Sequence, residues 1–390
     1  MRTVYLDNNA TTQPAPEVIE AMLPFFREHW GNPSSMHAFG GRVKKHVETA
    51  RAQVAALIGA EPAEILFTSG GTESDNMAIR GAVEAFGGRA HVITSRVEHP
   101  AVLEPCRWLA GQGHALTEID VDSEGQMNLA QLREALGEGR CVASIMWANN
   151  ETGVIFPIDE IAAMVKASGG VLHTDAVQAV GKLSIDVRRT PVDMLSLSGH
   201  KLHAPKGVGA VYIRKGAKVL PLMLGGHQEG GKRGGTENVP YIVGLGKACE
   251  LALGRQAGEA SATAALRDRL EAGLLRTCPD ARVNGDRANR LPNTTNISFQ
   301  YIEGESILYH LSDAGICASS GSACTSGSLE PSHVIRAMGV PFTAAHGSIR
   351  FSLSRYNTDG DIDHVLATLP GIVEKLRRMS PFVRTPAGGR

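Results

Sequence analysis

A lysine lies directly behind an apolar run in the stretch SLSGHKLHAPKGVG, which places Ser198, His200 and Lys201 close together. A second apolar run follows Gly-Val-Gly, so Lys201 is expected between two buried strands and partly out of contact with water. Desolvation disfavours the ammonium form and lowers the pKa of a lysine. An amine with a lowered pKa can attack a carbonyl carbon, and Lys201 is therefore a candidate Schiff-base amine.

An acidic residue, Asp175, follows the apolar run VLHT, and Gln178 comes three residues later. A carboxylate at the mouth of a buried strand is costly unless a cationic group pairs with it. Asp175 therefore predicts a positively charged partner at this strand end.

A glycine turn follows a third apolar run, EILF. In the sequence TSGGTESDN, Gly70, Gly71 and Thr72 stand at the start of a predicted helix. The free N–H groups of a helix start, together with a threonine hydroxyl, can hold a phosphate. An ordinary capped helix explains the pattern equally well, because neither a Walker lysine nor GxGxxG is present.

Two more strand ends carry polar residues: His99 follows HVIT, and Asn149 and Asn150 follow VASIMW. Taken singly, such a histidine is more often structural, and asparagines often close a turn. Their joint placement is informative because ligands of open α/β sheets bind beyond the carboxyl ends of the strands. A phosphate site, an acidic partner for a pyridinium and a Schiff-base lysine are together what pyridoxal phosphate requires.

A lone cysteine, Cys324, lies in the polar run ASSGSACTSGS at 318–328. Free cysteines are usually buried as small apolar side chains, but these neighbours cannot build a core. Gly321 and Gly327 would give the backbone the freedom that a moving thiol needs. The other cysteines follow apolar or helical patterns and are assigned no role: Cys106, Cys141, Cys249, Cys278 and Cys317.

The elements that must position these residues alternate between apolar strands and helices. Residues 40–58 place apolar side chains at spacings of four and three, which is typical of one helix face. A long helical pattern over 240–275 leads to a smaller α+β unit, with which we expect the N-terminal segment VYLD to pair. The runs that predict buried strands of a mostly parallel sheet are 64–67, 91–94, 142–147, 171–174, 194–197 and 210–213.

Composition limits the possible functions. The chain has 390 residues with 39 Lys and Arg against 40 Asp and Glu, so it lacks the basic surface typical of nucleic-acid or anionic-membrane binding. No signal peptide is visible, and no stretch reaches the roughly 18 apolar residues of a membrane span. The cysteines show no CxxC spacing, which favours a reducing compartment. We expect a cytoplasmic α/β protein of two domains.

Nine motifs, spread from Tyr5 to about Tyr356, resemble those of the cysteine desulfurases, and several are most similar to the nitrogen-fixation type. They are DNNATT, TSGGTESDN, VEHPAV, WANNETG, HTDAVQAVGK, SGHKLHAPKG, GGHQEGGKRGGTEN, SSGSACTSGSLEPSHV and HGSIRFSLSRY.

The resemblance implies a pyridoxal-phosphate-dependent transferase of fold type I, similar to aspartate aminotransferase, with a mainly parallel seven-stranded sheet in its large domain. The large domain would cover residues 13–258, and the smaller α+β domain would combine 1–12 with 259–380. The small domain would carry the catalytic loop at about 319–331, and residues 381–390 would form a flexible tail.

The same resemblance implies a role for each matching residue. Lys201 would bind the coenzyme covalently, Asp175 would pair with its pyridine nitrogen, and Gln178 would hydrogen-bond its phenolic oxygen. His99 would stack on the ring, and Asn150 would contact both coenzyme and substrate. The residues expected at the phosphate are Gly71, Thr72, Ser198 and His200, with Thr236 reaching the phosphate of the neighbouring subunit. Those expected at the substrate carboxylate are Arg350, Asn150 and Asn8.

The implied reaction removes sulfur from L-cysteine and gives L-alanine and a persulfide on Cys324, with His99 or Lys201 moving protons. The implied assembly is a homodimer with active sites at the subunit boundary. An iron–sulfur scaffold protein would accept the sulfur for cluster assembly in nitrogenase maturation, and the Cys324 persulfide could hold a transient [2Fe-2S] cluster.

Four alternatives stay open. The chain could be a housekeeping desulfurase that serves iron–sulfur clusters or tRNA thiolation, or a selenocysteine lyase or aminotransferase of the same fold. It could also be a non-catalytic sulfur or cluster carrier. An aminotransferase has no use for Cys324, and a carrier leaves Lys201, Asp175 and Arg350 unexplained.

Overall fold

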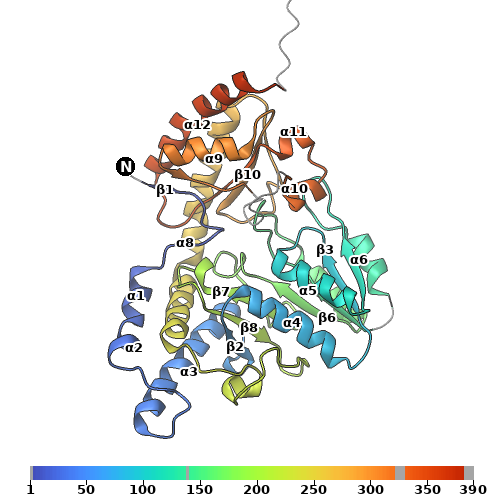
Figure 1. Cartoon of the computed structure of the whole chain (residues 1–390), viewed down its shortest axis with the longest axis vertical. Coiled ribbons are helices and arrows are strands. Elements are labelled where there is room, and N and C mark those ends of the chain that lie inside the picture. Colours follow the sequence, from blue (N-terminus) through green and yellow to red (C-terminus); the bar gives the residue numbers. More distant parts are fainter. Residues whose placement is uncertain (1–2, 138–139, 321–329, 382–390) are drawn as a thin grey trace, which may run out of the picture.

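The computed structural model describes residues 3–137, 140–320 and 330–381. Its largest element is a seven-stranded sheet (Figure 1) in which β8 runs antiparallel to both neighbours and the other pairs are parallel. The mainly parallel sheet predicted from the sequence is confirmed. Across the sheet the strands are β2 (Ile65–Thr68), β8 (Gly209–Ile213), β7 (Met194–Ser198), β6 (Val171–Asp175), β5 (Cys141–Ser144), β3 (His91–Ser95) and β4 (Ala115–Ile119).

The central strands are apolar along their whole length because helices cover both faces of the sheet. Val142 packs on one face with α4 (Gly71–Ala85) and α5 (Pro100–Gly111), and its neighbour Ala143 packs on the other. Successive side chains of a strand point to opposite faces, so a strand buried on both sides shows no polar alternation. The helices with side chains in the core of the second face include α3 (Ala38–Ile58), α6 (Leu129–Leu136), α7 (Ile158–Ala167) and the first part of α8 (Val239–Thr277).

Two strand predictions need correction. Strand β4 was not predicted, because as an edge strand it is exposed or half-buried at four of its five residues and lacks an apolar run. Strand β5 ends at Ser144 rather than at residue 147. The chain nevertheless stays beside β6, since the N–H groups of Ile145 and Trp147 donate to the carbonyls of His173 and Asp175.

A second hydrophobic core joins the two ends of the chain. The strand β1 (Val4–Tyr5) pairs in parallel with β11 (Ile316–Cys317), as the unaccompanied N-terminal strand predicts. An antiparallel sheet lies beside this pair, in the order β12 (Ser348–Ser352), β10 (Thr294–Phe299) and β9 (Ala281–Val283). The apolar side chains of these strands pack against α9 (Gly304–Asp313) and α12 (Asp359–Met379).

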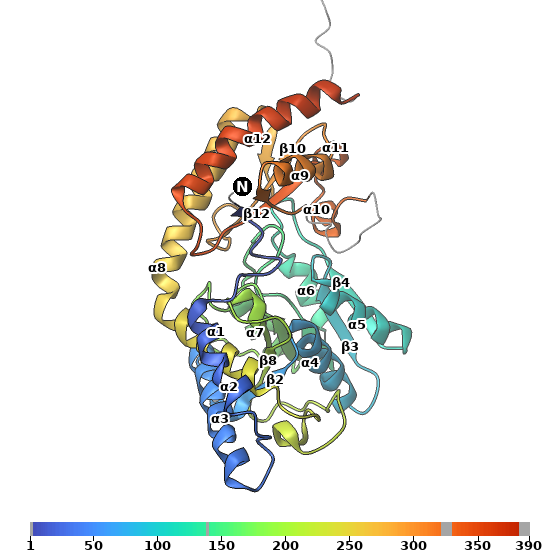
Figure 2. The same ribbon diagram turned by 60° about the vertical axis from the view of Figure 1, so that its left-hand side comes forward.

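The long helix α8 connects both cores (Figure 2). Ile242 and Leu245 belong to the core of the large sheet, whereas Leu270 and Leu274 belong to the second core. The predicted domain boundary at residue 258 falls inside this unbroken helix. The division into a large and a small domain stays a prediction.

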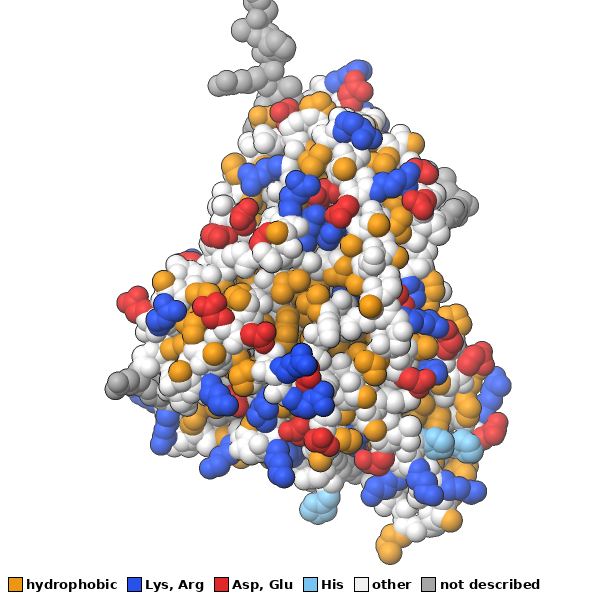
Figure 3. Space-filling model, turned by 180° about the vertical axis from the view of Figure 1, so that it is seen from behind, with side chains coloured by type: hydrophobic (Ala, Val, Ile, Leu, Met, Phe, Trp, Pro, Cys, Tyr) orange, Lys and Arg blue, Asp and Glu red, His pale blue; other side chains and the backbone are white. Residues whose placement is uncertain are grey.

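The remaining elements are short. They are α1 (Pro16–Met22), α2 (Pro24–Arg27), α10 (His333–Ala337), α11 (Phe342–Ala345) and three 3₁₀ turns at Pro62–Glu64, Gly199–Lys201 and Gln228–Gly231. On the face opposite to Figure 1, both charge signs are scattered and hydrophobic side chains gather in a recess at mid-height (Figure 3). None of the helices in the described ranges is both long enough and apolar enough to cross a bilayer.

Candidate active site

A cavity of about 400 Å³ lies beyond the carboxyl ends of the parallel strands. This volume is within the range of about 300–1,000 Å³ that is usual for small-molecule sites. The predicted residues that line it are Gly71, Thr72, His99, Asn150, Asp175, Gln178, Ser198, His200, Lys201 and Arg350. Residues more than 270 positions apart in the sequence therefore meet at one cavity.

Lys201 is placed in the cavity by a tight 3₁₀ turn that follows β7. The turn needs glycine at position 199, because a Cβ there would lie 2.9 Å from Val208 Cγ1. The Lys201 Nζ donates to the backbone carbonyls of Asn9 at 2.5 Å and Ala10 at 2.7 Å. The amine is thus held by the N-terminal segment at the cavity wall.

Asp175 is the last residue of β6 and is 8% exposed. Its Oδ1 accepts a hydrogen bond from the Val177 N–H at 2.9 Å. Burial raises the pKa of Asp175 to about 6, while this hydrogen bond and the charge of Lys201 oppose the rise. A cation placed beside the carboxylate would lower the pKa again, which is the pairing that a pyridinium nitrogen would make.

A second buried carboxyl group, Asp75, also lines the cavity and was not predicted. Burial and the nearby Asp175 raise the pKa of Asp75 well above its ordinary value. Its Oδ1 has no hydrogen-bond partner among the described residues, and His173 Nε2 lies 3.6 Å away. The motif TESDN contained the signal, since Asp75 lies one helical turn after Gly71 and so faces the same side of α4.

The start of α4 also lines the cavity, with Gly71 and Thr72. Gly70 has φ 153° and ψ −174°, a conformation that is essentially restricted to glycine. A Cβ on Gly71 would lie 2.9 Å from Val177 Cγ2, so this glycine allows the helix start to approach the loop after β6. The first N–H groups of an α-helix have no acceptor inside the helix, and they can bind a phosphate here beside Thr72 and Ser198.

The two histidines of the cavity are uncharged near neutral pH. Burial and the charge of Lys201 lower the pKa of both His99 and His200 to about 4. His99 caps α5, and its Nδ1 accepts the N–H of Ala101 at 3.1 Å. The remaining proton of the neutral ring is therefore on Nε2. His200 lies within hydrogen-bonding distance of Thr11, with 3.2 Å between Nδ1 and Oγ1.

Arg350 enters the cavity from β12 and is 5% exposed. Its Nη2 donates to Asp7 Oδ1 at 2.7 Å, and its Nη1 donates to the backbone carbonyl of Asn150 at 3.0 Å. The buried Nε has no hydrogen-bond partner among the described residues. The planar guanidinium of Arg350 lines the cavity and is suited to bind a carboxylate.

Two predicted residues, Asn8 and Thr236, are not among the residues that line the cavity. The buried side chain of Asn8 donates hydrogen bonds to the carbonyls of Tyr5 and Ser352. Its neighbour Asn9 lines the cavity instead. Thr236 does not line the cavity in this single chain. Cys324 lies outside the described residues.

Ion pairs that the sequence did not predict attach the loop that carries Thr236 to α4 and α3. Arg233 binds Glu73 in the first turn of α4 at 2.8 Å. Four residues earlier, the Glu229 carboxylate pairs with Arg51 at 2.7 Å and accepts the N–H of Phe67 at 3.1 Å. These contacts fix the loop beside the start of α4 and beside β2.

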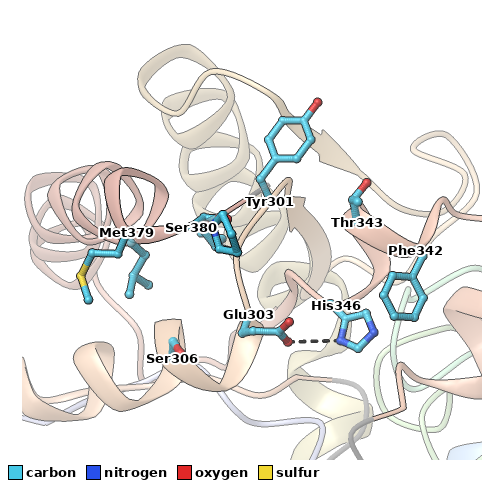
Figure 4. Close-up of a pocket in the computed structure, with 11 residues that line it drawn as sticks. Tyr301, Glu303, Ser306, Phe342, Thr343, His346, Met379 and Ser380 are labelled. Carbon is cyan, nitrogen blue, oxygen red and sulfur yellow. Dashed lines mark hydrogen bonds and ion pairs between the residues drawn. The ribbon is translucent and has the colours of Figure 1, made fainter. Parts of the chain in front are cut away.

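Another cavity, of about 230 Å³, lies between α9, α11 and α12 (Figure 4). It is lined by Phe342, Tyr301 and Met379 among others, with an ion pair of 3.1 Å between Glu303 and His346. None of the predicted catalytic or coenzyme residues is among its lining residues. In the described part of the chain, no three His, Cys, Asp or Glu side chains are grouped to hold a metal ion.

The residues of the 400 Å³ cavity fit pyridoxal phosphate. Lys201 is an amine that can bind an aldehyde, Asp175 can pair with a pyridinium, and the start of α4 can bind a phosphate. Arg350 lines the same cavity, and its guanidinium can bind the carboxylate of an amino acid. The four groups are thus complementary to one coenzyme and one substrate.

Comparison with known proteins agrees with this arrangement. The family model for aminotransferase class-V matches residues 4–365. A cysteine desulfurase of Nostoc sp. is 57% identical over 388 residues, which cover 100% of this chain and 97% of the relative. The cysteine desulfurase NifS of Azotobacter vinelandii is 56% identical over 383 residues, which cover 98% of this chain and 95% of the relative.

A solved structure of a NifS-like protein superimposes with a TM-score of 0.91 at 40% identity, covering 96% of this chain and 100% of that one. The predicted fold type I architecture is therefore confirmed. The chain belongs to the class-V aminotransferase family and, within it, to the cysteine desulfurases.

Proposed function

We propose that the protein removes the sulfur of L-cysteine with pyridoxal phosphate, giving L-alanine and a persulfide on Cys324. The reaction balances without a further oxidant, since the sulfur moves from one thiol to another and the substrate carbon gains a hydrogen. The observation that carries the proposal is the meeting of Lys201, Asp175 and Arg350 at one cavity of coenzyme size. The relatives named cysteine desulfurase, which match over the full chain, support the same reaction.

Pyridoxal phosphate supplies an electron sink for the bonds around the substrate Cα. Lys201 would hold it through its aldehyde carbon, and Asp175 would keep a proton on its ring nitrogen. Gln178 would donate to its phenolic oxygen, and the neutral ring of His99 would stack on it. Its phosphate would bind Gly71, Thr72, Ser198 and His200, all of which line the cavity.

The substrate carboxylate would bind the guanidinium of Arg350, which lines the cavity. Asp7 offsets the arginine charge in the structure, at 2.7 Å from Nη2. Asn150, whose carbonyl already accepts from Nη1 at 3.0 Å, would form the neighbouring wall for coenzyme and substrate. This anchor fixes the amino acid with its Cα toward the coenzyme.

Cys324 is the proposed sulfur acceptor. Ser319, five residues before it, lines the cavity and exchanges backbone hydrogen bonds with Arg350 of 2.6 and 3.2 Å. On the other side, Ser332 donates to the buried Glu151 at 2.5 Å, and His333 lies 2.9 Å from the carbonyl of Glu98. One flank of the cysteine segment thus lines the cavity, and the other contacts the sequence neighbours of the lining residues His99 and Asn150. A chain spans at most about 3.5 Å per residue, and the few residues between the flanks and Cys324 would allow the thiol to reach the cavity.

We further propose a homodimer in which Thr236 binds the phosphate of the neighbouring subunit. Large apolar side chains are exposed on the part of the chain around the large sheet, such as Trp30 at 71% and Leu224 at 86%. Exposed apolar groups of this size are typical of protein interfaces. Leu224 and Thr236 belong to the same loop, which Arg233 fixes at the start of α4.

The proposed sulfur acceptor is a scaffold protein for iron–sulfur clusters, in the pathway of nitrogenase maturation. The relative named NifS supports this pathway. A [2Fe-2S] cluster on the Cys324 persulfide would be a transient product, and the proposed site of action is the cytoplasm.

The test is the variant Cys324→Ala. It should keep the absorbance of bound pyridoxal phosphate and bind L-cysteine, but form no persulfide and release no sulfide. The matched control is Cys317→Ala, which removes a half-buried thiol on β11 and should leave turnover unchanged. Undiminished alanine formation by Cys324→Ala would disprove the persulfide route, and a protein that binds no coenzyme would disprove the function as a whole.

A further inference from the structure

A second, narrow cavity of about 50 Å³ shares Lys201 with the coenzyme cavity. It contains another lysine, Lys182, which none of the roles above uses. The other charged or titratable residues of its lining are His203, Glu259 and Arg355. Two lysines therefore meet at the same small space behind the coenzyme site.

Lys182 follows a turn, and its side chain forms hydrogen bonds with one residue, Gln178. It follows Gly181, which has φ 78° and where a Cβ would lie 2.3 Å from Leu202 Cδ2. Its Nζ donates to the backbone carbonyl of Gln178 at 3.0 Å and to the Gln178 Oε1 at 3.3 Å. No carboxylate forms an ion pair with Lys182 in the described ranges, so its hydrogen bonds go to this one glutamine.

The contact with Lys182 distinguishes the two ends of the Gln178 amide. An ammonium group can only donate, so the end that faces Lys182 must be the carbonyl oxygen. The other end, Nε2, donates to the carbonyl of Asn9 at 3.0 Å, which also accepts from Lys201 at 2.5 Å. The amide is therefore oriented with its NH₂ group on the side of Lys201.

We propose that Lys182 is a positioning residue, which fixes Gln178 so that its NH₂ group faces the phenolic oxygen of the coenzyme. The inference rests on the proposed function, in which Gln178 binds this oxygen. Without the ammonium, only the Asn9 carbonyl would hold this orientation, and an amide that turned over would present Oε1 to an oxygen that is itself negatively charged. Such a contact is repulsive, and the donor would be lost from the coenzyme.

The charge of Lys182 also acts on Lys201. Removal from water and the neighbouring Lys201 lower the pKa of Lys182 to about 7. His203 is uncharged, since burial lowers its pKa to about 4, and Glu259 is paired with Arg355 at 3.0 Å. Below a pH of about 7, Lys182 keeps its positive charge, which favours loss of the proton from the Lys201 nitrogen.

The test compares Lys182→Met with the wild-type enzyme loaded with pyridoxal phosphate. We expect the variant to bind the coenzyme about tenfold more weakly, because one well-oriented hydrogen bond is lost. The pH midpoint of the absorbance change of bound coenzyme should move upward by about one pH unit, since a nearby positive charge is removed. Lys182→Gln serves as a second variant if the methionine protein does not fold.

Two controls separate the possible causes. Lys247→Met removes a lysine that pairs with Glu250 on α8 and should change neither measurement. In a Gln178→Leu background no amide is left to orient, so the further loss of coenzyme affinity caused by Lys182→Met should largely disappear.

Unchanged coenzyme affinity and an unmoved midpoint in Lys182→Met would overturn the inference but leave the proposed function intact. An equal loss of affinity in the Gln178→Leu background would also overturn it, since Lys182 would then act through another group. Failure of the wild-type protein to bind pyridoxal phosphate would instead disprove the proposed function.

Discussion

The neutral histidines determine where positive charge is found in the active site. Burial and Lys201 keep the pKa of His99 and His200 at about 4, so neither ring adds a charge near neutral pH. The cations that remain on the cavity wall are Lys201 and Arg350, which stand on different elements. The proposed phosphate site at the start of α4 and the proposed carboxylate site at Arg350 stand on different elements, so we expect the substrate to bind in one orientation.

Replacing Arg350 tests the carboxylate anchor. Arg350→Ala should raise the KM for L-cysteine at least about thirtyfold, equivalent to a loss of about 2 kcal/mol, because a carboxylate in a buried site loses its charged partner. Steady-state kinetics with saturating pyridoxal phosphate would measure the change.

The matched control is Arg336→Ala, which removes an arginine that is half-exposed on α10 and pairs with Glu330. It should leave the KM unchanged. A KM that stays the same in Arg350→Ala would show that another residue binds the carboxylate.

At the scale of the elements, the strand ends were predictable and the side-chain contacts between distant segments were not. Parallel strands buried on both faces form apolar runs, so the residues after them could be read as one edge of a sheet. Edge strand β4 has no such run. Asn8 was predicted at the substrate, but the turn after β1 buries its side chain against Tyr5 and Ser352, and Asn9 lines the cavity.

The same limit applies to Asp75 and Lys182. Both stand inside motifs that the sequence analysis used, yet their importance depends on burial and on neighbours from other elements. The pKa of Asp75 is raised because α4 buries its carboxyl group in the core and places it near Asp175. The contact of Lys182 with Gln178 spans four residues, but its consequence depends on Asn9, which is 169 residues from Gln178.

The glycine that starts α4 gives a prediction for this element. A Cβ on Gly70 would have its nearest neighbour, Ser198 Oγ, at 3.8 Å, so space does not forbid a side chain. Its φ of 153° does, at a cost of about 1–3 kcal/mol. Gly70→Ala should therefore shift the helix start and weaken pyridoxal phosphate binding by about tenfold or more, measured by titration of the apoprotein.

A second glycine-to-alanine change provides the comparison. Gly41 lies in helix α3, and nothing is within 4 Å of a Cβ built on it. Gly41→Ala should stabilise the protein slightly, by about 0.4–1 kcal/mol, and leave coenzyme binding unchanged. Equal coenzyme affinity of the two variants would contradict a special role of the α4 start.

At the scale of the whole molecule, the active site lies between two hydrophobic cores, among buried polar residues. Glu151 is one of these polar residues and is 2% exposed. Its carboxylate accepts from Ser332 at 2.5 Å, and its backbone carbonyl accepts from Asn296 on β10 at 3.3 Å. Burial raises the pKa of Glu151 to about 7, against the opposing effects of Ser332 and Arg350.

This raised pKa predicts a pH-dependent stability. In the unfolded chain the carboxyl ionises near its ordinary pKa of 4.5, whereas the folded protein holds the proton up to about pH 7. The folded state therefore loses stability from Glu151 as the pH rises through this window, on the order of 3 kcal/mol in total. Glu151→Gln should raise the thermal unfolding midpoint of the apoprotein at pH 8 and give a much smaller gain at pH 5.

The other buried acids, such as Glu98 with its pKa raised to about 8, are present in both proteins. Their contribution cancels in the difference between variant and wild type. A gain for Glu151→Gln that is the same at both pH values would show that the carboxyl is not protonated in the folded state.

Asn9 links residues from distant parts of the chain. Its backbone N–H donates to Ser352 Oγ, and its side chain donates to Thr294 and Asn150. Its carbonyl oxygen accepts hydrogen bonds from Lys201 and Gln178. During synthesis on a ribosome, Ser352 emerges long after Asn9, so the wall behind the coenzyme is incomplete until nearly the whole polypeptide has been made. We therefore expect pyridoxal phosphate to bind in its final geometry only after translation is complete.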